Sequence, residues 1–474
     1  MKKIVAEILE KAGLKNAEVF VPEHESQGHY STNIALRLAK QEKKSPLDLA
    51  RELAGKIEKA VPPRFIEKIE AVPPGFINFW ISAKTAQEEF AHVLKNLANF
   101  GQSRAGESKT VIVEYSQPNI AKKMHVGHLR TTIIGDALAN VLEFSGYKVV
   151  RWNYLGDWGT QFGKLIAAYK MWGDEKTIKA DPINELQKLY VRFHDELKNN
   201  PDLDKCGQEE FRKLEEGDKE NRKLWEWFKK ESLREFEEAY ALLGIKKFDT
   251  YIGESFYEKE MQPLVARLKK AGIAKESEGA LIIPLEKAGL PLALVQRSDG
   301  ASLYLTRDIA NLEYRLKKYK PAKILYVVAN DQALHFSQLF AVATILDLED
   351  KAELVHVKYG LVLGEEGKKL ATREGRVVLS EEVLDRAMEL ARKTVDEKRP
   401  DLPEEKRREV AEAVGIGGLK YGMLKENRLT DIAFNWNQVL DFSGDSGPYL
   451  QYTYARLRSI LRKAGQMSDV RCRR

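Results

Sequence analysis

Two histidines, His125 and His128, lie three residues apart in the segment SQPNIAKKMHVGHLR (116–130). Side chains with this spacing share one face of a helix, so both imidazoles can contact the same ligand. A neutral imidazole can donate a hydrogen bond to a phosphate oxygen without the permanent charge that would hold the product. Lys122 and Lys123 add positive charge just before the first histidine. These residue types predict a site for an anionic ligand.

The elements around the histidines predict where this site lies in the fold. The β-branched run TVIVEY (110–115) is typical of a buried strand, and YKVVRWNY (147–154) is the next strand. A helical pattern between them completes a β-α-β unit with a parallel strand pair. The histidine segment therefore joins the carboxyl end of a parallel strand to a helix, where open α/β sheets bind their ligands.

The start of that helix has properties that suit a phosphate group. Its first backbone N–H groups lack partners within the helix and lie at the positive end of the helix dipole. Gly127 removes a side chain where an adenine ring or a phosphate could approach the backbone closely. We therefore expect a nucleotide at this loop, with unpaired backbone N–H groups among its contacts.

Other kinds of site fit the segment less well. A metal site needs further ligands, and no other Cys or His lies nearby in the sequence, so no metal is expected. The dinucleotide fingerprint GxGxxG is missing, and the segment GTQFGKL (159–165) is one residue short of a P-loop and lacks its final Ser or Thr. Taken alone, two surface histidines at a helix start remain the alternative.

Bulk properties favour a multidomain enzyme in the cytoplasm. A chain of 474 residues predicts two to four domains, and 77 Lys and Arg against 71 Asp and Glu favour an anionic partner only weakly. Cys206 and Cys472 match no disulfide framework, which makes a reducing cytosol the default. The N-terminal pattern predicts a helix rather than a signal peptide, and the longest apolar run, LFAVATIL (339–346), is too short to span a bilayer.

The order of patterns along the chain predicts an α/β protein with additional domains. Residues 1–85 combine helical patterns at 2–13 and 33–60 with strands at 65–72 and 75–81, which indicates an N-terminal α+β domain. A linker helix and loop follow at 86–109, with the helix over about 84–99.

Residues 110–360 predict a doubly wound parallel, Rossmann-like sheet with a charged helical insertion at about 164–290. After the insertion we expect a strand at 292–297, a helix from Asp308, a strand at 322–329 and a helix at 333–347. A loop region at 361–404 and a partial helical domain at 405–474 complete the chain.

These motifs together resemble one enzyme family. HVGH resembles the HIGH motif of class I aminoacyl-tRNA synthetases, and its surroundings are similar to arginyl-tRNA synthetases. The matching segments follow one another in the family's order: GHYSTNIALRLAK (28–40), SQPNIAKKMHVGHLRTTIIGDAL (116–138), NYLGDWGTQFGKL (153–165), YLTRDIANLEYR (304–315), VVANDQALHFSQLF (327–340), GKKLATREGRVV (367–378) and FNWNQVLDFSGDSGPYLQYTYAR (434–456).

The resemblance implies a two-step reaction with ATP and Mg²⁺ as substrate and no tightly bound cofactor. The carboxylate of L-arginine attacks the α-phosphate to give arginyl-adenylate, and the arginyl group then passes to the 3′ terminal adenosine of tRNA(Arg). His125 and His128 would stabilise the charge that develops on the α-phosphate. The second class I motif, KMSKS, begins here at Lys369 but has Thr372 in place of its second lysine. By resemblance, Lys122 supplies the compensating charge, with Lys123 as its backup.

The resemblance also implies an arginine pocket. Recognition of a planar guanidinium needs carboxylates placed for paired hydrogen bonds, which the point charge of lysine cannot satisfy equally. Asp308 and Tyr304 would face the guanidinium, and Glu114 would be a further acidic partner. As alternatives, Asp308 is a carboxylate at a helix start and Glu114 a surface residue. Asn119 and Gln332 would hold the α-amino end, and Gln117 stands where family members often carry a small residue.

Partners and completeness follow from the same resemblance. The N-terminal unit and the C-terminal helices would contact tRNA(Arg), and a monomer is the family default. Asp157, Trp158 and Gln161 would shape the site wall or contact the tRNA end, with packing of a turn as the alternative. We expect the chain to be short of most of the C-terminal anticodon-binding bundle. A truncated tRNA-binding fragment with weak or no aminoacylation is therefore the alternative function.

Overall fold

The computed structural model describes residues 1–61, 64–297, 304–363, 378–433, 435–439, 441 and 444–463. The described residues fall into two compact units: unit 1, residues 1–102, and unit 2, residues 103–463. In the described parts of the chain, no helix is long and apolar enough to cross a membrane.

Unit 1 packs helices against a small antiparallel sheet. The predicted helix 33–60 is two helices, because Lys43 adopts a left-handed conformation and Ser45 caps a new helix by accepting a hydrogen bond from the backbone of Asp48. The core includes Val5, Leu9 and Phe79. The elements are α1 (Lys2–Lys11), β1 (Tyr30–Thr32), α2 (Ile34–Glu42), α3 (Pro46–Ala60), β2 (Ile66–Val72), β3 (Phe76–Ile81) and α4 (Ala83–Lys95), with strand order β1-β3-β2.

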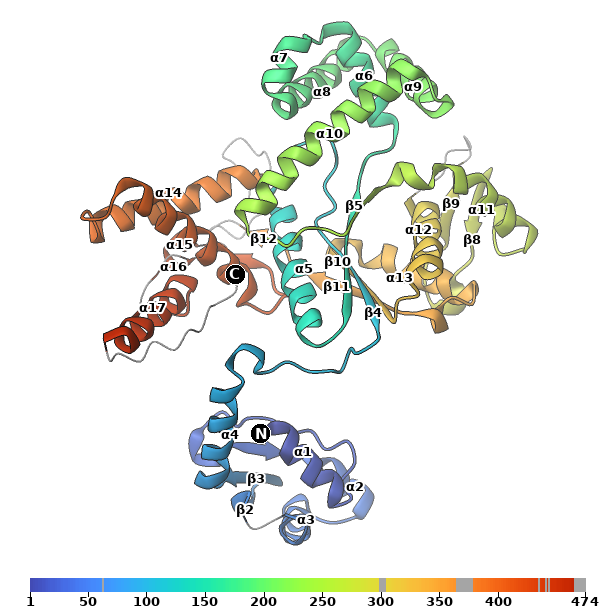
Figure 1. Ribbon diagram of the computed structural model, residues 1–474. Coiled ribbons are helices and arrows are strands. Elements are labelled where there is room, and N and C mark those ends of the chain that lie inside the picture. Colours follow the sequence, from blue (N-terminus) through green and yellow to red (C-terminus); the bar gives the residue numbers. More distant parts are fainter. Residues whose placement is uncertain are drawn as a thin grey trace. The chain divides into compact units, whose positions relative to one another are not determined.

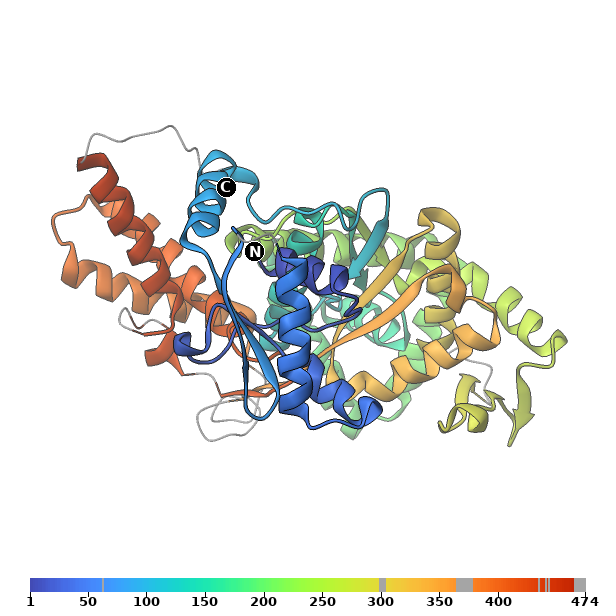
Figure 2. The ribbon, with the colours of Figure 1, turned by 90° about the horizontal axis from the view of Figure 1, so that it is seen from below.

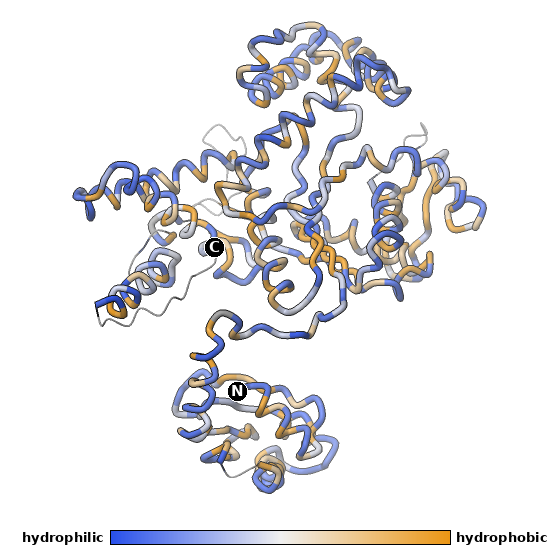
Figure 3. The backbone as a smooth tube through the Cα atoms, viewed as in Figure 1, coloured by the Kyte–Doolittle hydropathy of each residue, from blue (hydrophilic) through white to orange (hydrophobic). Residues whose placement is uncertain are grey.

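Unit 2 is built on a five-stranded parallel sheet, as the sequence predicts. Its strands lie in the order β11-β10-β4-β5-β6, and every pair is parallel. The central strands are continuous apolar runs, buried on both faces, and Figure 3 shows apolar residues gathered along them. The strands are β4 (Thr110–Glu114), β5 (Lys148–Leu155), β6 (Thr250–Gly253), β10 (Lys323–Ala329) and β11 (Glu353–Tyr359).

The two faces of the sheet carry different helices. Val111 and Val113 pack into one core with α5 and the C-terminal helices, whereas Ile112 between them packs into a second core with α11, α12 and α13. The helices on the first face are α5 (Val126–Phe144), α14 (Ser380–Lys398) and α15 (Glu404–Leu424); those on the second are α11 (Glu258–Lys270), α12 (Tyr304–Tyr319) and α13 (Ala333–Ile345). The doubly wound fold class is therefore confirmed.

The predicted insertion is a helical cluster with a core of its own. Figure 1 shows α10 extending from the other insertion helices towards the sheet. One part of α10 packs through Phe228 into the insertion core, and another packs through Phe236 and Tyr240 into the core of the sheet. The helices are α6 (Thr160–Trp172), α7 (Glu175–Ala180), α8 (Pro182–Asn199), α9 (Asp202–Glu216) and α10 (Lys219–Leu242).

The strand predicted at 292–297 does not join the parallel sheet, so that part of the prediction is wrong. It forms β9 (Ala293–Gln296) in a separate antiparallel sheet with β7 (Lys275–Ser277) and β8 (Ala280–Ile283). Its burial alternates, with Val295 buried and Leu294 exposed, whereas a central parallel strand is buried on both faces. Strand β6, at the edge of the parallel sheet next to β5, was not predicted. Helix α12 begins at Tyr304, four residues before the predicted Asp308.

Two short strands and two helices remain near the C-terminal end of the described chain. They are β12 (Val362–Leu363), β13 (Ile432–Ala433), α16 (Trp436–Val439) and α17 (Gly447–Lys463), and β12 pairs with β13. Val362 of β12 and Val439 of α16 pack into the core of the first face. Figure 2 shows α14, α15 and α17 at one end of unit 2 and the small antiparallel sheet at the other.

Helix α5 approaches the sheet at a glycine. A Cβ atom added to Gly135 would lie 2.2 Å from the buried ring of Tyr115, whereas one added to Gly55, in α3, meets no atom within 4 Å. We expect Gly135→Ala to destabilise unit 2 by about 1–3 kcal/mol through overpacking. Gly55→Ala should stabilise unit 1 by up to about 1 kcal/mol, because alanine favours a helix interior. Denaturant unfolding of both variants checks this, and similar effects at the two positions would contradict the packing.

Candidate active site

A cavity of about 580 Å³ lies at the carboxyl ends of β4, β10 and β11. This is the point where the order of the strands along the chain reverses, the usual place for a ligand in an open parallel sheet. Its size is that of ordinary small-molecule sites. Five residues predicted from the sequence line it together: Asn119, His125, Gly127, His128 and Gln332.

The two imidazoles are held by backbone groups at the start of α5. His125 is the N-cap, and its Nδ1 accepts a hydrogen bond from the Gly127 N–H at 3.1 Å. The His125 N–H in turn donates to Nδ1 of His128 at 3.0 Å, and the centres of the two rings lie 3.8 Å apart. Since each Nδ1 is an acceptor, each neutral ring must carry its proton on Nε2. The helix start therefore presents two imidazole N–H donors of defined tautomer.

Burial keeps both rings uncharged. It lowers the pKa of His125, and burial together with the proximity of His125 lowers the pKa of His128 to about 3. The sequence argument for neutral donors is therefore consistent with the surroundings of the rings.

The expectation of unpaired backbone N–H groups at this helix start is wrong for its first turn. The Val126 N–H donates to the carbonyl of Val378 at 3.0 Å, and the Gly127 N–H is used by His125. The N–H groups of His128 and Leu129 both donate to the carbonyl of His125. The imidazole Nε2–H groups replace the backbone as the available donors.

The loop before the histidines has an unusual backbone held by other elements. Ser116 and Gln117 follow β4 with φ values of 75° and 53°, in a region that side chains other than glycine rarely adopt. The Ser116 hydroxyl is hydrogen-bonded to Tyr240 at 2.6 Å, and Asn153 donates to the same tyrosine at 3.0 Å. Ser232 accepts from the N–H of Ala121 at 2.7 Å. Helix α10 and strand β5 thus fix the loop.

Sequence reasoning missed these supporting residues. Tyr240 and Ser232 lie in a charged helix far along the chain and give no local signal. Asn153 is a polar residue within the strand pattern YKVVRWNY, which is a sign in the sequence that its side chain has a partner in the fold. It is fully buried, and its side-chain oxygen accepts from the Gln117 N–H at 3.2 Å.

Asn119 lies against the end of β5. It forms a bridge with Gly156, and a Cβ atom at that glycine would come within 2.0 Å of the Asn119 side-chain oxygen. The glycine is therefore needed for the position of Asn119 in the cavity wall.

Lys122 and Lys123 do not line the cavity. The Lys122 ammonium lies 4.7 Å from the ring centre of Tyr190 in α8, and burial lowers its pKa. Lys123 forms a 2.5 Å ion pair with Glu381 at the start of α14. Both cations have partners within the chain that sequence reasoning could not see. Lys369 lies outside the described residues.

A different cation, Arg130, lines the cavity, and the sequence analysis did not single it out. Its side chain is fully buried, and its partners are backbone carbonyl groups rather than carboxylates. It donates to the carbonyl groups of Gly360, Leu361 (2.8 Å), Arg428 (3.3 Å) and Thr430 (3.0 Å). It thus anchors the segment that forms the opposite wall of the cavity.

The acidic residues assigned to an arginine pocket lie beside the cavity and not in its wall. Glu114 is buried and paired with Arg315, and burial raises the pKa of Glu114 while Arg315 opposes this. Gln117, which does line the cavity, donates to Glu114. The alternative of Glu114 as a surface residue is therefore wrong, and its role as a further acidic partner of the substrate stays a prediction.

Asp308 is also occupied. It accepts a hydrogen bond from Nε2 of His335 at 2.6 Å, and His335 follows the cavity residue Gln332 by three positions. Tyr304, one turn before Asp308 in α12, is exposed and does not line the cavity.

Asp157 and Trp158 are buried and contact other parts of unit 2, in agreement with the packing alternative. Asp157 is fully buried and accepts from Lys229 at 2.7 Å and from the Ser255 N–H at 2.9 Å. Trp158 packs edge-on against Phe211 and Trp225 of the insertion. Gln161 does not line the cavity of about 580 Å³.

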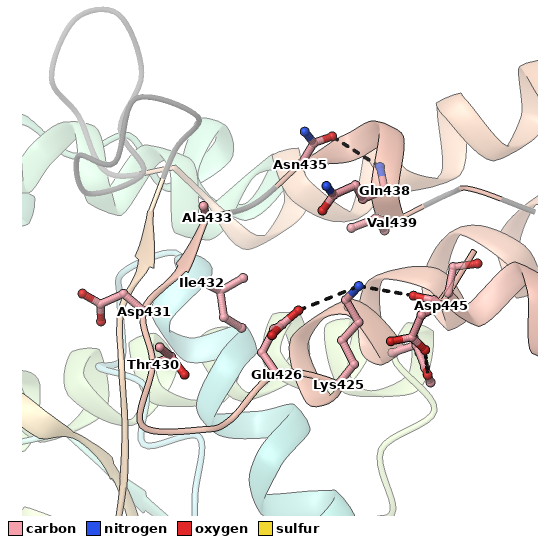
Figure 4. A pocket seen from close by; sticks show the side chains of 13 residues that line it. Lys425, Glu426, Thr430, Asp431, Ile432, Ala433, Asn435, Gln438, Val439 and Asp445 are labelled. Atoms are coloured by element: carbon pink, nitrogen blue, oxygen red, sulfur yellow. Dashed lines mark hydrogen bonds and ion pairs between the residues drawn. The ribbon is translucent and has the colours of Figure 1, made fainter. Parts of the chain in front are cut away.

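A second cavity, of about 240 Å³, lies between α15, β13 and α16 (Figure 4). Its polar side chains pair with one another: the Lys425 ammonium lies 3.8 Å from Glu426 and donates to the carbonyl of Asp445. It contains none of the residues predicted to carry chemistry.

Comparison with known proteins gives consistent matches along the chain. Residues 1–81 match the model "Arginyl tRNA synthetase N terminal domain", and residues 89–436 match "tRNA synthetases class I (R), catalytic domain". An arginine–tRNA ligase of Clostridium perfringens is 45% identical over 98% of this chain and 81% of its own length. One of Ligilactobacillus salivarius is 47% identical over 91% of this chain and 76% of its own.

Solved structures agree. The arginyl-tRNA synthetase of Plasmodium falciparum has a TM-score of 0.80 and 27% identity, covering 98% of this chain and 81% of that chain. That of Thermus thermophilus has a TM-score of 0.79 and 26% identity, covering 98% and 82%. The expectation that most of a C-terminal bundle is missing is not confirmed by these matches.

The lowered pKa of His128 makes folding stability depend on pH. Below the ordinary pKa of 6.5 the unfolded chain binds a proton at this ring and the folded chain does not, so stability falls as pH falls. The penalty is about 2 kcal/mol at pH 5. His128→Asn keeps an acceptor for the His125 N–H but cannot titrate. We expect its unfolding free energy to fall less than that of the wild type between pH 7 and pH 5 in denaturant titrations; equal slopes would contradict the assignment.

Proposed function

We infer the function from one premise: the chain belongs to the arginyl-tRNA synthetase family, as its matches over residues 1–81 and 89–436 show. It is an arginine–tRNA ligase, which activates L-arginine with ATP and joins it to tRNA(Arg). Relatives at 45–47% identity over most of the chain disfavour the alternative of a binding fragment without turnover.

We propose that the cavity at the ends of β4 and β10 binds ATP, supplied as its Mg²⁺ complex. The observation that carries this proposal is the pair of neutral imidazoles held with their Nε2–H groups as donors. In the activation step, the arginine carboxylate attacks the α-phosphate and pyrophosphate leaves. The two Nε2–H groups stabilise the charge that develops on the α-phosphate oxygens, and neutral rings release the product readily. Gly127 lines the same cavity, and a Cβ atom there would come within 2.9 Å of the His125 ring, so the glycine leaves space for that imidazole.

Positive charge for the triphosphate is supplied by Arg130, Lys122, Lys123 and Lys369. Arg130 contributes a buried guanidinium whose position is fixed by carbonyl groups. Lys122 and Lys123 reach the phosphates only after leaving Tyr190 and Glu381. Lys369 retains its proposed role as the first lysine of the second motif.

The substrate arginine lies between the cavity and the acidic residues. Asn119 and Gln332, in the cavity wall, hold its α-amino end. Asp308 receives the guanidinium, with Tyr304 beside it. Glu114 acts through its neighbours, because its carboxylate is shared between Arg315 and Gln117. The guanidinium is thereby recognised by a carboxylate close to, but separate from, the nucleotide.

Unit 1 is proposed to contact tRNA(Arg), which the match of residues 1–81 to an arginyl-tRNA synthetase N-terminal domain supports. We further propose a cytoplasmic location and a monomeric state.

Exchange of pyrophosphate into ATP tests the first step directly. We expect exchange that depends on L-arginine, measured with and without tRNA(Arg). Tight tRNA binding without any arginine-dependent exchange would instead support the binding-fragment alternative.

His128→Asn tests the imidazole donors. The variant retains the acceptor that the helix start needs and lacks the Nε2–H, so we expect the exchange rate to fall at least about tenfold with little change in melting temperature. His92→Asn, in the exposed part of α4, is the matched control and should exchange as the wild type. A His128→Asn variant with wild-type exchange would remove that residue from the mechanism.

Asp308→Asn tests the arginine pocket. The amide has the shape of the carboxylate without its charge, so we expect KM for arginine to rise by about tenfold or more while KM for ATP stays near the wild-type value. Unchanged discrimination against lysine would contradict the placement of the guanidinium.

A further inference from the structure

Both carboxylates assigned to the substrate guanidinium already have a basic partner in the chain. Glu114 is paired with Arg315, and Asp308 is hydrogen-bonded to His335 at 2.6 Å. A cationic substrate must therefore compete with one of these two internal partners.

The Glu114–Arg315 pair is permanent. Its side chains are 4% and 0% exposed, and the Arg315 guanidinium lies over Trp152 at 4.4 Å and near Tyr326 at 5.5 Å. Breaking a buried ion pair leaves an uncompensated charge in the interior, which is strongly unfavourable. Arg315 therefore neutralises Glu114 and orients it.

The Asp308–His335 pair is exchangeable. The Asp308 side chain is 19% exposed and that of His335 is 25% exposed, and a single hydrogen bond joins them. His335 stands on α13, three residues after the cavity residue Gln332 and on a different helix from Asp308. Because both side chains are partly exposed, a ligand can replace the imidazole without opening the core.

Charge counting shows what the exchange requires. With Glu114 neutralised by Arg315, an imidazolium on Asp308 leaves this part of the site without net charge. A neutral imidazole leaves one negative charge, which matches the single positive charge of a guanidinium. A protonated His335 is thus a competitor for the substrate, and a neutral one is a much weaker competitor.

We propose that His335 is a specificity-determining residue of the arginine site: it covers Asp308 while the site is empty, and it gives up its proton when the substrate guanidinium takes that carboxylate. The proton passes to solvent, so arginine binding releases it. This inference rests on the proposed function of Asp308. A guanidinium offers two parallel hydrogen bonds in exchange for the one it breaks, whereas an ammonium offers a point charge, so His335 disfavours lysine.

The surroundings support this direction of exchange. Burial lowers the pKa of His335, but the hydrogen bond and charge of Asp308, aided by Glu114, raise it above its ordinary value. When the guanidinium occupies Asp308, that support is lost and a positive charge is added, so the pKa falls. Arginine should therefore bind more weakly as pH falls through the raised pKa of the empty site.

Other titratable groups face this pair from neighbouring elements. His356 of β11 lies beyond the ring of Phe336, and burial lowers its pKa. Glu254 forms a 3.5 Å ion pair with Arg307, and burial raises the pKa of Glu254 to about 8. The remaining neighbours that interact with Asp308 are Glu114, Tyr154, Tyr257 and Tyr326. Among these, Glu254 has a pKa of about 8, at the upper end of the pH range used below, and needs a control of its own.

Calorimetric titration of the full chain with L-arginine tests the proposal without catalysis. Measurements between pH 6 and pH 8, in buffers of different ionisation enthalpy, count the protons released. We expect the wild type to release up to one proton and its Kd for arginine to rise by up to about tenfold per pH unit below the pKa of the empty site. Absence of proton release from the wild type would overturn the proposal whatever the variants do.

His335→Gln is the decisive variant, because it keeps a donor in the place of Nε2 and cannot be protonated. We expect it to bind arginine with no proton release and a Kd that does not change with pH. Glu254→Gln and His356→Gln are the matched controls and should retain the release. Proton release that persists in His335→Gln, or that disappears in Glu254→Gln, would overturn the assignment.

Asp308→Asn separates this inference from the proposed function. If that variant binds arginine as well as the wild type does, the guanidinium site itself is wrong. If it loses arginine while His335→Gln keeps the proton release, only the role of His335 is wrong. His335→Ala adds a selectivity readout: without the competing imidazole, lysine should inhibit arginine binding at lower concentrations than in the wild type.

Discussion

Backbone N–H groups at the start of α5 are bonded to imidazole nitrogens, and the site depends on this arrangement. A helix start usually offers its N–H groups to a ligand or to a capping hydroxyl or carboxylate. Here the His125 and Gly127 N–H groups fix two rings, select their tautomer and leave Nε2–H as the outward donor. Burial then keeps the rings neutral. The donors available to a ligand are therefore imidazole N–H groups, and the backbone determines their positions.

The sequence predicts those elements of the fold whose pattern lies within their own residues. The runs TVIVEY and AKILYVVA have enough apolar residues to be buried on both faces, and both are central strands. The run LALVQR (292–297) is also largely apolar, and its alternating burial is not visible without the neighbouring strands. The short strand β6 carries only four residues and no comparable run. Its position depends on pairing with β5.

The same distinction holds for the site. The spacing of His125 and His128, with Asn119 and Gln332 from the resemblance, was sufficient to bring these residues to one cavity. The partners of the charged residues could not be predicted, because they come from distant segments. Lys123 meets Glu381 and Glu114 meets Arg315 only after the chain has folded. Buried charges need partners, and the described charged residues assigned to the site have them: Lys122 lies over Tyr190, Lys123 meets Glu381, Glu114 meets Arg315 and Asp308 meets His335.

Helix α10 connects the insertion to the loop before the histidines. Its Ser232 and Tyr240 hold the strained loop before the histidines, while Phe228 and Trp225 on the same helix are embedded in the insertion core. A rigid rod fixed at both ends transmits displacement, so the insertion and the nucleotide loop form one mechanical unit. A macromolecule that bound the insertion and favoured one position of α10 would therefore be coupled to any ligand of this loop, and the coupling would be reciprocal.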